Sequence, residues 1–251
     1  MARSGSSHLV IAEQLHLPGM TTVYDICEVE KLLKETGVKV FVGTDEAGRG
    51  SLAGPVVAAA VYLGEDFDGD GIRDSKELSA KQRERLYRRI RREAKCFSIQ
   101  RIESGDIDRI NIRQASLLAM KKAVEAVARK LRKEYKLVPD MIIIDGRDKL
   151  DIKFPQQAVV KGDKRSVSIA AAGILAKVHR DAIMKNFDKK YPLYKFSENM
   201  GYGTPDHLKT LHSVGCSPIH RKSYQPVAEA HARFVKKASW IDIQGLTSEE
   251  K

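Results

Sequence analysis

The strongest signal in this chain of 251 residues lies in residues 40–55, which read VFVGTDEAGRGSLAGP. The apolar start of this stretch, Val40 to Thr44, predicts a buried strand. Asp45 and Glu46 follow this strand directly, and a glycine-rich turn comes next. Because ligands bind at the carboxyl ends of strands in open α/β sheets, we expect both acids to lie in a functional site. The stretch therefore predicts an α/β fold with an acidic site at one edge of its sheet.

Two further acids follow apolar runs in the same way. Asp145 comes after Met141 to Ile144, and Asp163 comes shortly after Ala158 to Val160. Each of these acids alone has an ordinary explanation as a turn residue. Four carboxylates gathered at one sheet edge would repel one another, and divalent cations would be needed to keep them ionised. The combination therefore favours a two-metal site for phosphoryl chemistry.

The charge balance indicates the kind of substrate. Lys and Arg number 44 against 33 Asp and Glu, which gives a net charge of +11. Such a surface attracts polyanions, so a basic exterior around an acidic pocket fits an enzyme that binds a nucleic-acid backbone. The simpler interpretation is that the excess charge only keeps the protein in solution.

The cellular location is indicated by apolar runs, the N-terminal pattern and the cysteines. No apolar run approaches the roughly 20 residues of a membrane-spanning helix, so we expect no membrane contact. The first ten residues lack the basic-then-apolar pattern of a secretory signal. Cys27, Cys96 and Cys216 are odd in number and far apart, which fits reduced thiols better than disulfides or a zinc site. These features predict a cytoplasmic protein.

Apolar periodicity places the elements along the chain. It predicts strands at 40–44, 56–63, 96–102, 141–145 and 156–160. It predicts helices at 25–35, 81–95, 111–135, 166–187, 204–212 and 226–237. The helices at 81–95 and 111–135 have basic faces, for which simple solvation is the plainer interpretation. We expect three parts: an extension with a short helix at 1–36, one compact domain at 37–225, and a C-terminal helix with a polar tail at 226–251.

Six motifs occur in a fixed order between about residues 38 and 225. They are Val42–Pro55, Asp74–Leu78, Ile144–Gly146, Val160–Asp163, Ser168–Ala172 with Ile174–Val178, and Gly201–Thr204 leading to Pro218–Arg221. This ordered set resembles ribonuclease HII. The resemblance implies a ribonuclease H-like fold, with a mixed five-stranded sheet flanked by helices and a C-terminal helical segment.

The resemblance also implies an activity and a cofactor. The expected enzyme is a metal-dependent endonuclease that hydrolyses the RNA strand of RNA/DNA hybrids and incises 5′ of single ribonucleotides in duplex DNA. Its products would carry 5′-phosphate and 3′-hydroxyl ends, and it would act as a monomer. The residues implied to be catalytic and to bind two Mg²⁺ or Mn²⁺ ions are Asp45, Glu46, Asp145 and Asp163. Hard divalent cations prefer carboxylate oxygens, so the two lines of reasoning reach the same four residues.

Substrate-binding residues are implied in the same way. The loop of Gly48, Arg49 and Gly50 resembles the family's sensor of the 2′-hydroxyl, and Tyr202 resembles the residue that packs on the next deoxyribose. Both also have plain interpretations, as a tight turn and as a half-buried aromatic ring. Ser75 and Lys76 resemble phosphate contacts. Charge and proximity alone add weaker candidates: Lys161, Lys164, Arg165, and His220 to Lys222.

Two departures and two alternatives complete the interpretation. Gly173 stands where relatives often have Ser, and Met200 stands where a basic or small residue is common. One alternative is the sister type, ribonuclease HIII, which usually has Lys in the glycine loop where this chain has Arg49. The other is a non-catalytic nucleic-acid-binding protein, which the presence of all four acids disfavours. A nucleotide cofactor is also disfavoured, because the third glycine of a dinucleotide site and the Walker lysine are missing.

Overall fold

A mixed five-stranded sheet forms the centre of the protein, as expected. The computed structural model describes residues 25–246, with side chains for residues 25–235. The strands are β1 (Phe41–Ala47), β2 (Val56–Tyr62), β3 (Cys96–Ile102), β4 (Met141–Asp145) and β5 (Gln156–Val159). They lie in the order β3-β2-β1-β4-β5. The pairs β1–β2 and β2–β3 are antiparallel, whereas β1–β4 and β4–β5 are parallel.

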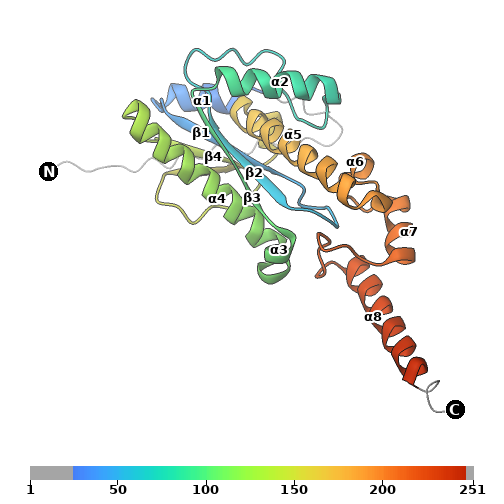
Figure 1. The fold of residues 1–251 in the computed structure, drawn as a ribbon. Coiled ribbons are helices and arrows are strands. Elements are labelled where there is room, and N and C mark those ends of the chain that lie inside the picture. Colours follow the sequence, from blue (N-terminus) through green and yellow to red (C-terminus); the bar gives the residue numbers. More distant parts are fainter. Residues whose placement is uncertain (1–24, 247–251) are drawn as a thin grey trace, which may run out of the picture.

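Helices cover both faces of this sheet (Figure 1). The main helices are α1 (Glu28–Glu35), α2 (Ala80–Glu93), α3 (Ser104–Ile110), α4 (Ile112–Lys130), α5 (Val167–Lys190), α6 (Phe196–Asn199), α7 (Pro205–Val214) and α8 (Gln225–Leu246). Alternate residues of β2 face opposite layers: Ala58 and Ala60 pack with α4, while Val57 and Ala59 pack with α2 and α5. All of β2 is therefore buried, as its small side chains predict.

Capping residues fix where the helices begin. Ser79 and Gln82 form a reciprocal capping box at α2, and the Ser166 hydroxyl accepts a hydrogen bond from the Ile169 amide at α5. Thr204 caps α7 in the same way. These are the starts predicted from the sequence, because a side-chain acceptor satisfies an amide that has no partner within the helix.

The sequence prediction differs from the structure in several places. The short helix α6 was not predicted, and α8 runs to Leu246 and does not end at residue 237. The first strand does not end at Thr44, because β1 stays paired with β2 up to Ala47 opposite Val57. Asp45 and Glu46 therefore lie within a strand and not after one. The helix α3 was not predicted, since it has seven residues and buries only Ser104 and Ile107.

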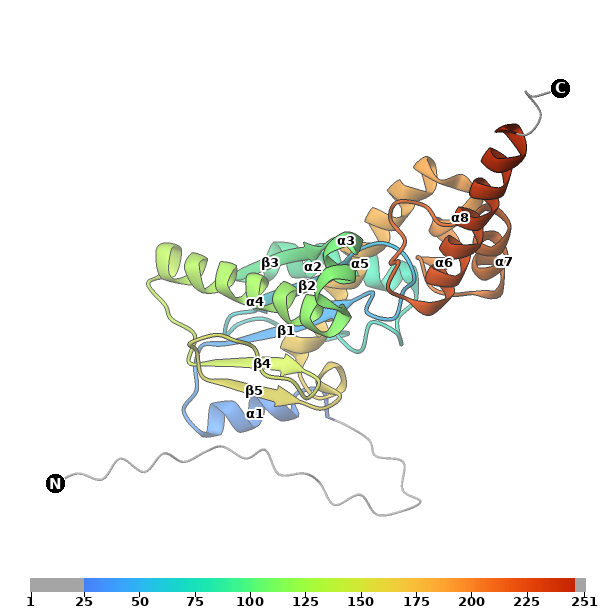
Figure 2. The ribbon, with the colours of Figure 1, turned by 90° about the horizontal axis from the view of Figure 1, so that it is seen from below.

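The helix α1, which falls in the predicted extension, packs on the sheet. Val29 and Leu33 are buried in one cluster with Ile143 and Val159, and Figure 2 shows α1 alongside β5. The separation of residues 1–36 from the domain stays a prediction, because residues 1–24 lie outside the described part. The end of the predicted tail, residues 247–251, lies outside it as well.

The segments after α5 form a further apolar cluster at the far end of the molecule (Figure 2). Met184 of α5 packs there with Phe196 of α6, Leu211 of α7 and Val227 of α8. Leu52, from the loop between β1 and β2, packs into the same cluster. This contact ties the glycine-rich loop to the C-terminal segment. Among the helices that the structure describes, none has the length and apolar character needed to span a bilayer.

Candidate active site

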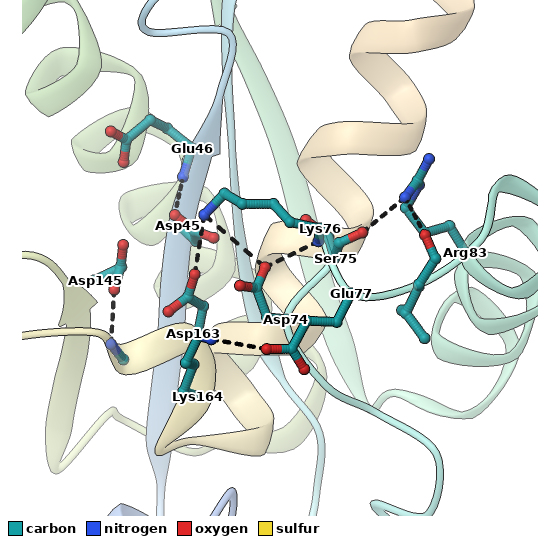
Figure 3. A network of polar contacts seen from close by, with 12 residues as sticks. Asp45, Glu46, Asp74, Ser75, Lys76, Glu77, Arg83, Asp145, Asp163 and Lys164 are labelled. Carbon is teal, nitrogen blue, oxygen red and sulfur yellow. Dashed lines mark hydrogen bonds and ion pairs between the residues drawn. The ribbon is translucent and has the colours of Figure 1, made fainter. Parts of the chain in front are cut away.

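The sheet topology brings two of the sequence-predicted acids, Asp45 and Asp145, close together. The parallel register pairs Thr44 of β1 with Ile144 of β4. The next positions along these strands are Asp45 and Asp145, so both carboxylates lie at the same end of the sheet. Asp163 lies nearby in a short 3₁₀ turn, whose Gly162 amide donates a 2.8 Å hydrogen bond to Asp145 Oδ1. Figure 3 shows Asp45, Asp145 and Asp163 near one another, with the carboxylate of Glu46 directed away from Asp163.

The acids destabilise one another's ionised forms. Burial raises the pKa of Asp45 well above its ordinary value, and the charges of Asp145, Glu46 and Asp163 raise it further. Burial and then the charge of Asp163 raise the pKa of Asp145. Burial also raises the pKa of Glu46, with a further contribution from Asp145. Carboxylates that burial and repulsion disfavour in this way are stabilised by a bound cation.

Two basic side chains partly compensate this charge. Lys76 Nζ donates a 3.1 Å hydrogen bond to Asp163 Oδ2 and lies 3.9 Å from Asp74 Oδ1. Burial alone would lower the pKa of Lys76, but its hydrogen bond to Asp163 and the nearby acids raise it. On the other side, Arg49 Nη1 lies 3.4 Å from Glu46 Oε1. The acidic group therefore has one solvent-exposed basic side chain at each flank.

The donor set fits hard divalent ions. All four acids offer carboxylate oxygens, and burial, followed by repulsion among the acids, raises the pKa values of Asp45, Glu46 and Asp145. Within the described residues, no three Asp, Glu, His or Cys side chains already surround one point as metal ligands. Asp163 is paired with Lys76 and Glu46 with Arg49 in this structure. The assignment of the four acids as metal ligands stays a prediction.

The absence of a side chain at position 173 shapes this site. A Cβ at Gly173 of α5 would overlap Asp45 Oδ2. The departure noted in the sequence therefore lies directly against the first acid, and the carboxylate of Asp45 occupies the space that a Ser side chain would fill.

The glycine-rich loop leaves the sheet immediately after the acids. Gly48 has φ 88°, and a Cβ there would overlap the guanidinium of Arg180. Only glycine meets both requirements without strain. Arg49 and Gly50 are exposed, and nothing lies within 4 Å of a Cβ built on Gly50. The loop backbone is therefore open to a ligand.

The structure brings this loop and Tyr202 together, although 152 positions separate Tyr202 from Gly50 in the sequence. The amide of Leu52 donates a 2.8 Å hydrogen bond to the carbonyl of Gly201. Tyr202 is 38% exposed as a residue, and the Arg180 guanidinium and Lys177 Nζ lie 5.7 Å and 5.8 Å from the centroid of its ring. Two cations thus hold an exposed aromatic ring beside the loop.

The predicted phosphate contacts lie in two places: in the segment with Ser75 and Lys76, and at Lys164 and Arg165, which are paired with acids. Lys76 is exposed, and Arg83 Nη1 holds the preceding segment through a 2.8 Å hydrogen bond to the Ser75 carbonyl. Lys164 pairs with Glu77, and Arg165 pairs with Glu28 through two hydrogen bonds.

The prediction was wrong for His220 and Arg221, because both side chains are buried and cannot touch a nucleic-acid backbone. Lys222 is exposed.

Sequence reasoning missed the buried polar residues beneath the loop. Arg180 and Arg221 are both 0% exposed. His207 and His220 are buried and join through their Nε2 atoms at 3.0 Å. Arg and His usually lie at surfaces, and the partners of these residues are up to 173 positions away, so no local pattern could reveal them.

A mixed sheet with acids at the ends of its central parallel strands, on a basic molecule, is the arrangement typical of metal-dependent nucleases of the ribonuclease H-like class. Comparisons with known proteins agree. The family model described as Ribonuclease HII matches residues 42–227. A ribonuclease HII from Caldicellulosiruptor saccharolyticus is 46% identical over 195 residues, covering 78% of this chain and 91% of that protein.

Solved structures support the fold. Ribonuclease H2 from Pyrococcus horikoshii OT3 superposes with a TM-score of 0.65 at 23% identity, covering 78% of this chain and 99% of that one. Bst-RNase HIII in complex with Mn²⁺ superposes with a TM-score of 0.60 at 18% identity, covering 78% of this chain and 70% of that one. The family model and the sequence relative show that the chain belongs to the ribonuclease HII family. It is a divalent-metal-dependent ribonuclease H, an endonuclease that acts on RNA/DNA hybrids.

Proposed function

We propose that this enzyme also incises duplex DNA on the 5′ side of a single embedded ribonucleotide, leaving 5′-phosphate and 3′-hydroxyl ends. The observation that carries the proposal is the contact of the loop 48–52 with the Tyr202 segment, immediately after the acids of β1. A lone ribonucleotide differs from its neighbours by one 2′-hydroxyl. Recognition therefore needs one group that binds this hydroxyl and another that accepts the deoxyribose beside it. The loop backbone suits the first task and the ring of Tyr202 the second.

The four acids would hold two divalent ions, Mg²⁺ or Mn²⁺. When bound, such ions activate a water and stabilise the leaving 3′ oxygen. The carboxylates of Asp45, Glu46, Asp145 and Asp163 would position these ions at the end of the sheet. Lys76, whose side chain is 78% exposed, can turn from Asp163 to a phosphate of the substrate. The hydroxyl of Ser75 would contact the same strand.

Two further features belong to the proposal. We propose that the protein acts as a monomer, since one chain supplies all the acids, the loop and Tyr202. We also propose a cytoplasmic location, which its three free cysteines support because reduced thiols are typical of that compartment.

Mapping the cut tests the proposal. A labelled duplex with one ribonucleotide, its all-DNA counterpart and a continuous hybrid would be incubated with Mg²⁺ and, separately, with Mn²⁺. We expect cleavage 5′ of the ribonucleotide, a product end that DNA ligase can rejoin to a 3′-hydroxyl, and no cleavage of the all-DNA duplex. Cleavage of the hybrid alone would disprove the proposal and leave the family's hybrid activity standing.

The matched variant is Asp45→Asn, which keeps the size of the side chain and removes its charge. We expect turnover to fall by at least about a thousandfold, while hybrid affinity stays within a few-fold because the basic surface supplies binding. If the variant kept most of its turnover at saturating metal, Asp45 would not be a ligand.

A further inference from the structure

Arg221 is a buried cation with only neutral partners beneath the glycine-rich loop. Its Nε donates a 3.0 Å hydrogen bond to the Gly54 carbonyl. Its Nη2 donates a 2.6 Å bond to the Gly48 carbonyl, and its Nη1 donates 2.9 Å and 3.1 Å bonds to the Arg49 carbonyl and the Tyr224 hydroxyl. Burying a charge is costly unless hydrogen bonds satisfy it, so these bonds fix where the loop carbonyls can lie.

The direction of those carbonyls determines the direction of the loop amides. All the described peptide bonds are trans, and in a trans peptide the N–H points opposite to the C=O. The carbonyls of Gly48 and Arg49 point inward to Arg221. The amides of Arg49 and Gly50, which share those two peptide planes, therefore point outward.

These two amides are available to a ligand. Both residues are exposed, and neither amide donates to an acceptor within the described part of the chain. Two consecutive outward N–H groups form a donor pair of the kind that binds an oxygen. The pair lies three residues beyond the acids of β1.

We propose that Arg221 is the positioning residue that aims this amide pair at the 2′-hydroxyl, and that it thereby sets the preference for ribose over deoxyribose. The inference rests on the proposed function. A guanidinium suits this role because its planar fork reaches several acceptors at once, whereas the ammonium of Lys offers one nitrogen. Tyr224 completes the arrangement, since its hydroxyl donates a second hydrogen bond to the Arg49 carbonyl at 2.9 Å.

Binding to a matched pair of duplexes tests the inference. One duplex carries a single ribonucleotide and the other is all DNA, and Ca²⁺ replaces Mg²⁺ to prevent cleavage. The readout is the ratio of the two dissociation constants for one enzyme preparation, which is insensitive to the fraction of folded protein. For Arg221→Lys we expect this ratio to fall about tenfold, because freed peptide planes no longer present both donors. Affinity for the all-DNA duplex should change less than twofold.

Two controls separate positioning from stability. Met120→Ala removes a buried side chain of α4 in the core and should destabilise the fold without changing the ratio. Tyr224→Phe removes the hydroxyl that donates to the Arg49 carbonyl and accepts from Arg221 Nη1, but leaves the other bonds of Arg221 in place, so it should lower the ratio by about threefold. This variant decides the question if Arg221→Lys does not fold.

An unchanged ratio in the folded variants, or equal losses of affinity for both duplexes, would overturn the inference. A wild-type ratio of one would overturn the proposed function itself, and the inference with it.

Discussion

Single side chains set how much negative charge the end of the sheet carries. Asp45 and Asp145 repel each other across neighbouring strands, and burial strengthens the effect. Lys76 is the basic side chain that lies among these acids (Figure 3). It holds Asp163 by a hydrogen bond while most of its own surface stays in solvent. A flexible ammonium in this position competes with a metal ion for the same carboxylate oxygens.

The competition gives a prediction for the free enzyme. Replacing Lys76 by Met should tighten Mn²⁺ binding several-fold in the absence of nucleic acid, because Asp163 loses its internal counter-ion. Titration calorimetry with Mn²⁺ measures this directly. The control is Lys121→Met, which removes the same charge from a lysine that pairs with Asp151 on another part of the surface. Weaker or unchanged binding in the Lys76 variant would show that its ammonium does not compete with the metal.

The ring of Tyr202 gives a second prediction at this scale. It would stack on a sugar that lacks a 2′-hydroxyl and crowd one that has it. Tyr202→Ala should therefore lose far more kcat/KM on a duplex with one ribonucleotide than on a continuous hybrid. Tyr202→Phe keeps the ring and should retain both activities. Equal losses on the two substrates would make Tyr202 a packing residue.

At the scale of elements, a directional hydrogen-bond chain joins α7 to the loop before α8. The amide of Ser217 donates to His220 Nδ1 at 2.9 Å, so a neutral His220 carries its proton on Nε2. That proton can be donated to His207 Nε2, 3.0 Å away. His207 then carries its proton on Nδ1 and donates it to the Tyr202 carbonyl at 2.8 Å. The chain is complete only when both histidines are neutral.

The chain predicts loss of stability in acid. Burial, followed by repulsion from His207, lowers the pKa of His220 to about 3. Since the unfolded chain binds the proton near pH 6.5, the stabilisation is complete above that pH and is lost as the pH falls toward 3. Between pH 7 and pH 4 we expect His220 alone to lower the free energy of unfolding by roughly 3 kcal/mol.

Urea unfolding at both pH values measures this loss. The variant His220→Gln should show a smaller decrease, whereas His212→Gln, which changes an exposed histidine of α7, should behave like the wild type. If His220→Gln loses as much stability in acid as the wild type, another group is responsible.

How far the sequence predicts the elements depends on whether the signal is local. The strands Cys96–Ile102 and Met141–Asp145 have the predicted bounds, because their apolar patterns are complete within themselves. The extension of β1 to Ala47 depends on pairing with β2, which no pattern within β1 shows. The four acids were predicted from supposed strand ends and from motifs, although Asp45 and Glu46 lie inside β1, and their assignment as ligands stays a prediction. Arg221 was misassigned to the surface, because its acceptors come from the distant loop 48–54.

At the scale of the whole molecule, the two basic helices lie on opposite faces of the sheet, and their ends differ in distance from the site. The order of strands defines these ends. The strand β1 runs toward the acids, β4 is parallel to it, and β3 is parallel to it through two antiparallel pairings. A helix that leads into β3 or β4 therefore ends far from the acids. The start of α2 is accordingly near the site, and the end of α4 is remote from it.

This geometry predicts which charges bind substrate. Hybrid affinity should fall with salt with a log–log slope of about −3 or steeper, as expected when several basic side chains displace phosphate counterions. Replacing Lys81 and Arg85, exposed at the start of α2, by Gln should make the slope shallower by up to about two. The charge-matched control replaces Arg129 and Arg132, exposed at the remote end of α4 and in the turn after it, and should leave the slope unchanged. Dissociation constants measured by fluorescence anisotropy across a salt series give each slope.

Equal changes in both double variants would mean that the net charge of +11 acts as a diffuse field. A flat response in the wild type would mean that it is not used for substrate at all. The predicted difference between the two helices holds only if the hybrid lies across the carboxyl end of the sheet, where Lys76 leads into α2.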